Sequence, residues 1–146
     1  MKLVICEKPS VGAAVAAALG VTGKKDGYIE NDKYIISWCI GHLVQLSEAA
    51  VYGEQYRKWS YDSLPILPQE WQYTVAADKG KQFKILKDLM HRADVSEVVN
   101  ACDAGREGEL IFRFVYHQAG CKKPFTRLWI SSMETDAIRS GFEHLK

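Results

Sequence analysis

The feature that most constrains this chain is an apolar segment that ends abruptly in acidic residues. Residues 95–102 are predicted to form a short apolar strand. Asp103 follows at once, then a tight Ala-Gly turn, then Glu107 and Glu109, which open a new apolar helix. One or two acids at a helix start complement the helix dipole and need no further explanation. Three acids so close together repel one another, so the pattern favours a site for a hard cation such as Mg²⁺.

A second strand ends in a similar way at the start of the chain. Residues 2–6 are a β-branched run suited to a buried parallel strand, and Glu7 and Lys8 follow it directly. On its own, this Glu-Lys pair is typical of a solvated turn. In open α/β sheets, however, ligands collect beyond the carboxyl ends of the strands. If the two strands are neighbours, Glu7 and Asp103 face the same crevice.

The rest of the sequence alternates between strand and helix patterns. Strands are predicted over residues 2–6, 34–40, 71–76, 95–102 and 125–130, with a hairpin partner for the second of them at 27–30. Helices are predicted over residues 11–19 with Ser10 as N-cap, 79–92, 108–118, and 135–145 with Thr135 as cap. Residues 44–50 are predicted as a short helix or loop, and residues 51–68 as mostly irregular. The alternation predicts an α/β fold with a mainly parallel sheet covered by helices on both faces.

Length and composition fit one compact domain. The 146 residues can bury a full core, and 47% of them are hydrophobic. No apolar run approaches the ~20 residues of a membrane span, and the N-terminus lacks the pattern of a signal peptide. We therefore expect no membrane association. The last helical pattern is cut at Lys146, so we interpret residues 1–146 as a single domain and as the N-terminal fragment of a longer protein.

The cysteines indicate the redox environment of the chain, and the net charge limits how it can contact nucleic acid. None of the four Cys forms a CxxC pair, so zinc is not expected. Cys6 and Cys102 lie within apolar strands and are expected to pack as small hydrophobes. A reducing cytoplasm is the natural setting for such a chain. The net charge of +1 gives no overall basic field, so any contact with nucleic acid has to use a local cluster.

Three short motifs carry a family resemblance. They are Glu-Lys-Pro-Ser at residues 7–10, Gly-His-Leu at residues 41–43 and Asp-x-x-Arg-Glu-Gly-Glu at residues 103–109. Together they closely resemble the N-terminal Toprim domain of type IA DNA topoisomerases, most of all the bacterial topoisomerase III branch. The resemblance covers almost the whole chain and includes residues 59–68 and 127–138. It implies a Rossmann-like Toprim fold.

The acidic motif alone also admits primases and some nucleases that carry Toprim domains. Glu-Lys-Pro-Ser six residues after the initiator Met is more specific to the topoisomerases. A Toprim nuclease or primase, which would use the same acids for hydrolysis or synthesis, stays open as an alternative. So does a non-catalytic module that binds single-stranded nucleic acid without metal.

The resemblance also implies roles for the acidic residues. Glu7, Asp103 and Glu107 are the implied ligands of Mg²⁺, for which Mn²⁺ can substitute, and Glu109 is a less certain member of the set. Glu7 and Lys8 are the implied catalytic residues. Lys8 can neutralise the phosphate at the break or protonate the leaving oxygen. Outside this motif it would be an ordinary surface Lys.

Two further residues are candidates for contacting a DNA phosphate. His42 follows a strand end and can reach the crevice, although a lone His is equally well a packed or solvated side chain. Arg106 can pair with a phosphate, or it can simply hold the neighbouring carboxylates in place. The family's motif usually carries a second Asp where this chain has Gly105. A single main metal site is therefore expected.

By resemblance, the whole enzyme cuts one DNA strand through a tyrosyl-phosphate, passes another strand and reseals the break without ATP. This chain supplies charge neutralisation but no nucleophile. None of its seven Tyr lies in a segment that resembles the family's nucleophile motif, and Tyr116 is expected to pack within its own helix. We therefore expect the fragment to be inactive alone. The implied partners are DNA with single-stranded regions and the remaining domains of the same enzyme.

Other side chains have simpler expected roles. Four aromatic residues can stack on bases but are expected to pack in the core; they are Trp59, Tyr61, Trp71 and Tyr73. Four lysines are expected to form the solvated face of an amphipathic helix; they are Lys79, Lys81, Lys84 and Lys87.

Overall fold

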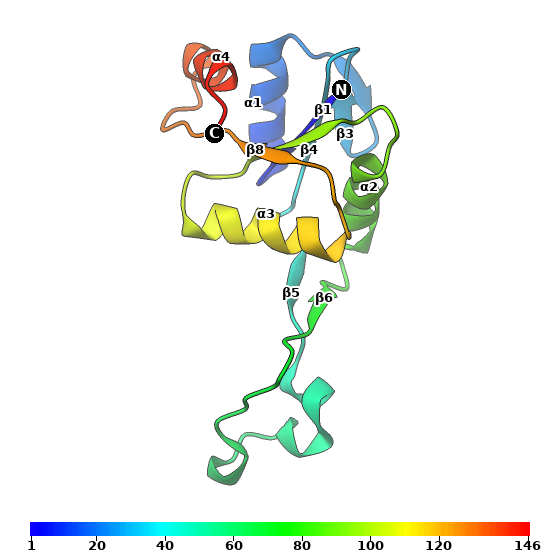
Figure 1. Ribbon diagram of the computed structural model, residues 1–146, viewed down its shortest axis with the longest axis vertical. Coiled ribbons are helices and arrows are strands. Elements are labelled where there is room, and N and C mark those ends of the chain that lie inside the picture. Colours follow the sequence, from blue (N-terminus) through cyan, green and yellow to red (C-terminus); the bar gives the residue numbers. More distant parts are fainter.

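A six-stranded sheet in the order β2-β3-β4-β1-β7-β8 organises the chain in the computed structural model, which describes residues 1–146 (Figure 1). The strands of this sheet are β1 Lys2–Cys6, β2 Gly23–Lys25, β3 Tyr28–Glu30, β4 Tyr34–Trp38, β7 Glu97–Ala101 and β8 Phe125–Arg127. Strands β4, β1, β7 and β8 are parallel, whereas β2 and β3 add an antiparallel edge. The predicted mainly parallel sheet and the hairpin between β3 and β4 are confirmed, and β2 is an additional strand.

Helices cover both faces of the sheet. They are α1 Pro9–Leu19, α2 Gly80–Met90, α3 Arg106–Gln118 and α4 Thr135–Glu143. Because side chains alternate along a strand, Leu3 and Ile5 of β1 join the core beneath α2 and α3, while Val4 and Cys6 join the core beneath α1 and α4. The predicted α/β fold is confirmed. None of the helices is both long and apolar enough to cross a membrane.

Two predicted helix caps are wrong by one or two residues. Helix α1 begins at Pro9, and the residue before it is Lys8 in extended conformation, so Ser10 lies inside the first turn. Proline suits this position because its fixed φ fits a helix and the first N–H groups have no intrahelical partner. Similarly, Thr135 is the first residue of α4, and Glu134 takes the cap position.

The start of α3 depends on a glycine. The helix begins at Arg106, two residues earlier than predicted, and Gly105 precedes it in extended conformation. A Cβ at Gly108 would lie 2.7 Å from the backbone N of Asp103 and closer still to its carbonyl O. Only glycine therefore lets the first turn of α3 pack directly on the turn that carries Asp103.

A long projection leaves the body between β4 and α2 (Figure 1). Its stalk is the antiparallel pair β5 Val44–Leu46 and β6 Tyr73–Val75. Its lobe holds three 3₁₀ turns, η1 Ala49–Tyr52, η2 Glu54–Tyr56 and η3 Tyr61–Ser63. We call residues 45–74 the arm. The helix or loop predicted over residues 44–50 is therefore wrong at its start, because β5 gains its ladder from β6, a partner distant in sequence.

The aromatic residues divide between the core and the surface. Tyr116 is buried in α3 as predicted, and its hydroxyl donates to the carbonyl O of Lys123 at 2.7 Å. The prediction of core packing is wrong for the four arm aromatics, which are all exposed: Trp59, Tyr61, Trp71 and Tyr73. The physical reason is that the arm has no core of its own.

The two cysteines and three of the four lysines lie as predicted, whereas Lys79 precedes α2, is half-buried, and donates from Nζ to the carbonyl O of His42 at 3.2 Å. Cys6 and Cys102 are buried free thiols among apolar side chains. Lys81 and Lys84 lie on the exposed face of α2, where they pair with Asp26 and Asp88.

Candidate functional site

The candidate site lies at the carboxyl ends of β1 and β7. These strands are parallel neighbours, with Cys6 opposite Ala101. Glu7 follows Cys6 directly, and Asp103 follows two residues after Ala101. The two acids therefore emerge at the same edge of the sheet, as the strand patterns predicted for neighbouring strands.

Glu7 is electrostatically strained by this arrangement. Its Oε2 is shielded from solvent and has no hydrogen-bond partner. Burial, and then the close Asp103 carboxyl, raise the pKa of Glu7, whereas the charge of Lys8 opposes the rise. Two acids in contact, one with an unpartnered buried oxygen, are what a hard cation would relieve. The donor set therefore fits Mg²⁺.

Glu107 extends from the first turn of α3 and contacts a different partner. Its Oε1 meets Nε2 of His42, which lies on the connection between β4 and β5. The structure thus brings His42 to the acidic motif. No three His, Cys, Asp or Glu side chains form a ready metal-binding group. Glu107 would have to leave His42 to share a cation with Glu7 and Asp103.

Glu109 is held apart from the other acids. Its carboxylate accepts a hydrogen bond from Nδ2 of Asn100 at 2.9 Å and one from Nε of Arg113 at 2.7 Å. A second cation, Nε of Arg127, lies 3.7 Å from its Oε2. These contacts already neutralise the charge of Glu109. We therefore assign Glu109 a structural role, in which it holds α3 against the sheet.

Arg127, at the end of β8, is a site residue that the sequence reasoning missed. Its side chain is only 11% exposed. Its Nη2 donates to the backbone carbonyl of Asp103, while Nε and Nη1 have no hydrogen-bond partner. Arg127 therefore fixes the turn that carries Asp103. Its only sequence signal was its place within the strand predicted over residues 125–130, in a segment that resembles the family.

Asn100 is the second residue that was missed. It is fully buried in β7, and its Oδ1 accepts the backbone N–H of Cys102 at 3.1 Å. Its amide thus joins the acid-bearing turn to Glu109 on α3. An Asn directly after two valines near the end of a predicted buried strand was the available signal, because a buried amide has to be satisfied by specific partners.

Two basic side chains lie at the rim of the site. Lys8 precedes α1 and Arg106 begins α3, and both are exposed. Neither side chain makes a hydrogen bond or an ion pair within the chain, in contrast to Arg113 and Arg127. Both are therefore free to meet an anionic ligand.

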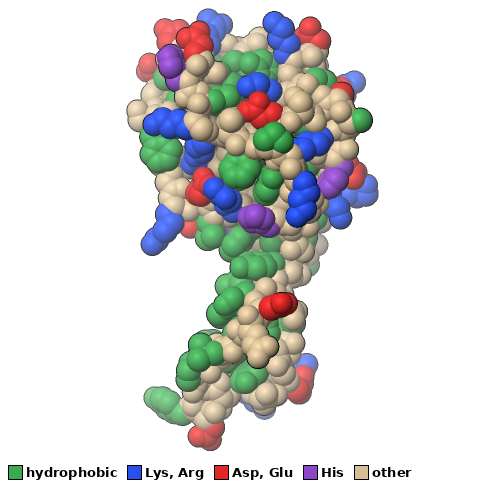
Figure 2. Space-filling view, viewed as in Figure 1, with side chains coloured by type: hydrophobic (Ala, Val, Ile, Leu, Met, Phe, Trp, Pro, Cys, Tyr) green, Lys and Arg blue, Asp and Glu red, His purple; other side chains and the backbone are tan.

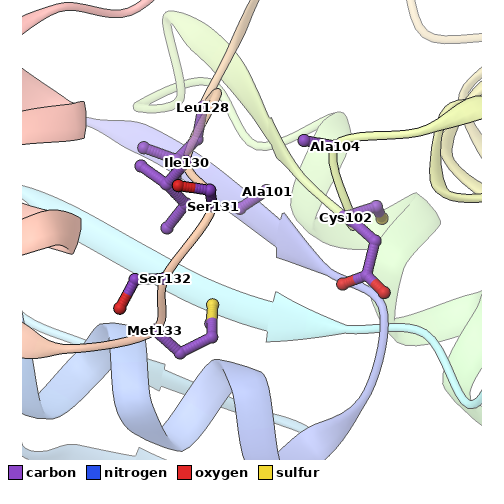
Figure 3. A pocket seen from close by; sticks show the side chains of 9 residues that line it. Ala101, Cys102, Ala104, Leu128, Ile130, Ser131, Ser132 and Met133 are labelled. Atoms are coloured by element: carbon purple, nitrogen blue, oxygen red, sulfur yellow. The ribbon is translucent and has the colours of Figure 1, made fainter.

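A cavity of about 280 Å³ opens beside Asp103 (Figure 3). Leu128, Ile130 and Met133 give it an apolar lining, and Ser131 and Ser132 add hydroxyl groups. In Figure 3 these residues lie on the segment that faces Ala101 and Cys102 at the end of β7. The cavity thus combines an apolar wall with a polar edge next to the acids.

Comparison with known proteins places this arrangement in a family. The model of the Toprim domain matches residues 2–133. The chain belongs to the Toprim family. This confirms the resemblance carried by the motifs at residues 7–10 and 103–109.

Relatives of this Toprim domain are bacterial topoisomerases. It is 47% identical over 145 residues to DNA topoisomerase 3 of Shouchella clausii, and 44% identical over 144 residues to DNA topoisomerase 3 of Bacillus subtilis. Each alignment covers 99% of this chain and 20% of the relative. The Toprim domain is thus topoisomerase 3-like and spans about a fifth of the length of these relatives.

A solved structure supports the fold. The full-length topoisomerase I from Thermotoga maritima matches with a TM-score of 0.65 and 18% sequence identity. The match covers 99% of this chain and 21% of that chain. At this identity it supports the Toprim architecture alone.

Proposed function

We propose that this Toprim domain provides the metal and phosphate site of an ATP-independent type IA topoisomerase III that breaks and reseals one DNA strand. The observation that carries the proposal is the close approach of Glu7 and Asp103 at the ends of neighbouring strands. The identity to topoisomerase 3 proteins over the whole chain supports the same activity.

In this proposal Glu7, Asp103 and Glu107 hold Mg²⁺, or Mn²⁺ in its place. All three offer carboxylate oxygens, the ligands that these hard cations prefer. A bound cation neutralises the charge of the phosphate at the break. Because Gly105 offers no side chain and Glu109 is already paired, a single main site is expected.

The remaining work falls to residues at the rim. Lys8 lies beside Glu7 without a partner, so it can stabilise the charged phosphate and donate a proton to the leaving 3′ oxygen. Glu7, which lies next to Lys8, is the alternative proton carrier. His42 and Arg106 flank the acids from other elements and are the proposed contacts to DNA phosphates.

The substrate in this proposal is DNA with a single-stranded region, and the nucleophile is a Tyr in another domain of the same enzyme. None of the seven Tyr of this chain lines the cavity beside Asp103. The cavity has the apolar wall and polar edge suited to a nucleotide next to the metal. We place the whole enzyme in the bacterial cytoplasm.

Two parallel assays test the function. The 146-residue chain, incubated with labelled single-stranded oligonucleotide and Mg²⁺, should leave it intact. A longer protein that carries this domain should relax negatively supercoiled plasmid with Mg²⁺ and without ATP. Specific cutting by the short chain would favour the nuclease alternative. Absence of relaxation by the longer protein would reject the topoisomerase assignment.

A further inference from the structure

Lys79 is set apart from the other lysines near α2. In the view of Figure 2, Lys and Arg side chains lie at the surface of the body, as is usual for charged groups. Lys79 is instead half-buried, and its Nζ donates to the carbonyl O of His42, 37 positions away in the sequence, at 3.2 Å. It pairs with no carboxylate of the chain, whereas the exposed Lys81 pairs with Asp26 at 2.9 Å. The charge of Lys79 is therefore directed at the backbone of His42.

The backbone of His42 has no other hydrogen bond within the chain. His42 lies outside the helices and strands, and neither its N–H nor its carbonyl O pairs with another backbone group. Backbone groups in such a connection need partners from side chains or water. Lys79 is the side chain that supplies one here. The position of His42 therefore depends on Lys79 and not on the hydrogen bonds of the sheet.

The residues on either side of His42 are anchored by backbone hydrogen bonds. Gly41 turns the chain with a φ of 62°, and its N–H donates to the carbonyl O of Glu7 at 3.4 Å. The carbonyl O of Leu43 accepts the N–H of Ala76 at 2.8 Å, at the base of the stalk. One flank thus contacts the strand end that carries the site, and the other contacts the segment before α2. His42 lies between these two anchors.

Lys79 is itself held in a fixed place. Its N–H donates to the carbonyl O of Ala76 at 3.0 Å, and its carbonyl O accepts the N–H of Phe83 at 3.1 Å in the first turn of α2. Phe83 packs against the main core. Ordering a Lys side chain costs rotamer entropy that one ordinary hydrogen bond barely offsets. The fixed backbone and the half-buried stem lower this cost, so the contact with His42 can persist.

The ring of His42 carries this contact to the site. Its Nε2 meets Oε1 of Glu107 in the first turn of α3. Because the imidazole ring is rigid and only two rotatable bonds join it to the backbone, the place of the ring follows the place of the His42 backbone. Lys79 thus lies two contacts away from Glu107 and pairs with none of the acids of the site.

We propose that Lys79 is a positioning residue, whose ammonium group fixes the backbone of His42 and thereby the place of the His42 ring beside Glu107. This inference rests on the proposed function, in which His42 contacts a DNA phosphate and Glu107 binds the metal. Without Lys79, the ring would leave Glu107 and the phosphate contact would lose its place. The alternative is that the stem of Lys79 only covers apolar surface, as long charged side chains often do.

Nuclear Overhauser contacts in the 146-residue chain separate these two roles. At fixed pH and without metal, the wild type should show a contact between the ring protons of His42 and the side-chain protons of Glu107. Lys79→Met, which keeps the apolar stem, should lose this contact, whereas Lys79→Arg, which keeps a charged N–H donor, should retain it. Lys81→Met is the matched control, because it removes the same charge two residues away and should retain the contact.

Strand cleavage by a longer topoisomerase that carries this domain gives the second readout. Lys79→Met should form covalent adducts with a labelled oligonucleotide about 10–10²-fold more slowly, the scale of a misplaced group, while oligonucleotide binding changes by less than about threefold. Lys79→Arg should recover most of the rate. A side chain that only covers apolar surface would not give this split between rate and binding.

Several results would overturn the proposal. If the wild type lacks the contact between His42 and Glu107, or if Lys79→Met retains it, Lys79 does not place the ring. Equal loss in Lys81→Met would assign the effect to charge near α2, and normal cleavage by Lys79→Met would deny Lys79 a part in the reaction. Lys79→Ser should fold, because Ser suits the position before a helix. If this variant and Lys79→Met both fail to fold, Lys79 supports the fold instead.

This test and that of the proposed function fail separately. The Overhauser comparison is made on the 146-residue chain without DNA. It therefore decides whether Lys79 places the His42 ring even if the longer protein does not relax DNA.

Discussion

Glu7 and Asp103 lie side by side although nearly a hundred residues separate them along the chain. They follow β1 and β7, which pair in register, and burial together with the Asp103 carboxyl raises the pKa of Glu7. Deprotonated Glu7 is therefore disfavoured in the folded chain unless a cation is present.

Glu7→Gln should raise the melting temperature of the metal-free domain at pH 7 by about 1–3 °C. A raised pKa in the folded state means that the wild type loses stability as the pH rises from the unfolded value, about 4.3, through the folded value. The variant lacks this loss, so the two should melt alike at pH 3. Mg²⁺ should stabilise the wild type more than the variant. A lower melting temperature with an intact response to Mg²⁺ would contradict this account.

Two glycines of the acidic motif should respond in opposite ways to alanine. Gly108→Ala places a Cβ against the backbone of Asp103 and should cost about 1–3 kcal/mol of unfolding free energy. Gly105→Ala is the matched control, because nothing lies within 4 Å of its Cβ position and its backbone is extended. Urea denaturation measures both. Equal losses would refute the close packing of α3 on the acid-bearing turn.

Arg127→Met should weaken the response to Mg²⁺ more than it weakens the fold. The variant removes the donor that holds the carbonyl of Asp103 and leaves Glu109 with Asn100 and Arg113. Half-saturation of thermal stabilisation should therefore need several-fold more Mg²⁺. Arg127→Lys should recover the charge but only part of the effect, since one ammonium cannot reproduce the planar guanidinium. An unchanged Mg²⁺ requirement in both variants would exclude a positioning role.

Glu97 gives a pH dependence of the opposite sign. Its carboxylate accepts a hydrogen bond from Thr126 at 2.6 Å and pairs with Lys2 at 3.2 Å, and these contacts lower the pKa of Glu97. Because the pKa of Glu97 is lower in the folded state, this carboxylate stabilises the fold at pH values above its unfolded pKa. The stabilisation is lost as the pH falls through the folded pKa. Glu97→Gln should cost about 1–2 kcal/mol at pH 7 and nothing near pH 2 in chemical denaturation. A loss that persists at pH 2 would point to packing instead of charge.

Local sequence patterns were sufficient for the sheet and for the acids at its edge. Residues 2–6 and 95–102 were each predicted as a strand followed directly by an acid, and the structure pairs them. What local patterns could not predict were contacts made by distant partners. Strand β5 exists because β6 pairs with it, and Arg127 reaches Asp103 because β8 lies beside β7.

The arm shows a second limit of sequence reasoning. The hydrophobic character of Trp59 and Tyr61 predicted that they would be buried. Hydrophobicity does not indicate whether the core of the same domain or another surface buries them. Within these 146 residues no other element reaches them, so both are exposed. Such side chains are better read as candidates for an interface when the chain covers only 20% of its relatives.

The most direct test of the central claim is strand cleavage by a longer enzyme that carries this domain with Glu7→Gln. Covalent adducts with a labelled single-stranded oligonucleotide should form at least about 10²-fold more slowly at saturating Mg²⁺, the scale of losing a charge-stabilising group, while oligonucleotide binding stays within about twofold. Glu97→Gln, a paired acid at the opposite end of the sheet, is the control and should cleave normally. Near-normal cleavage by Glu7→Gln would contradict the assignment of this crevice as the site of chemistry.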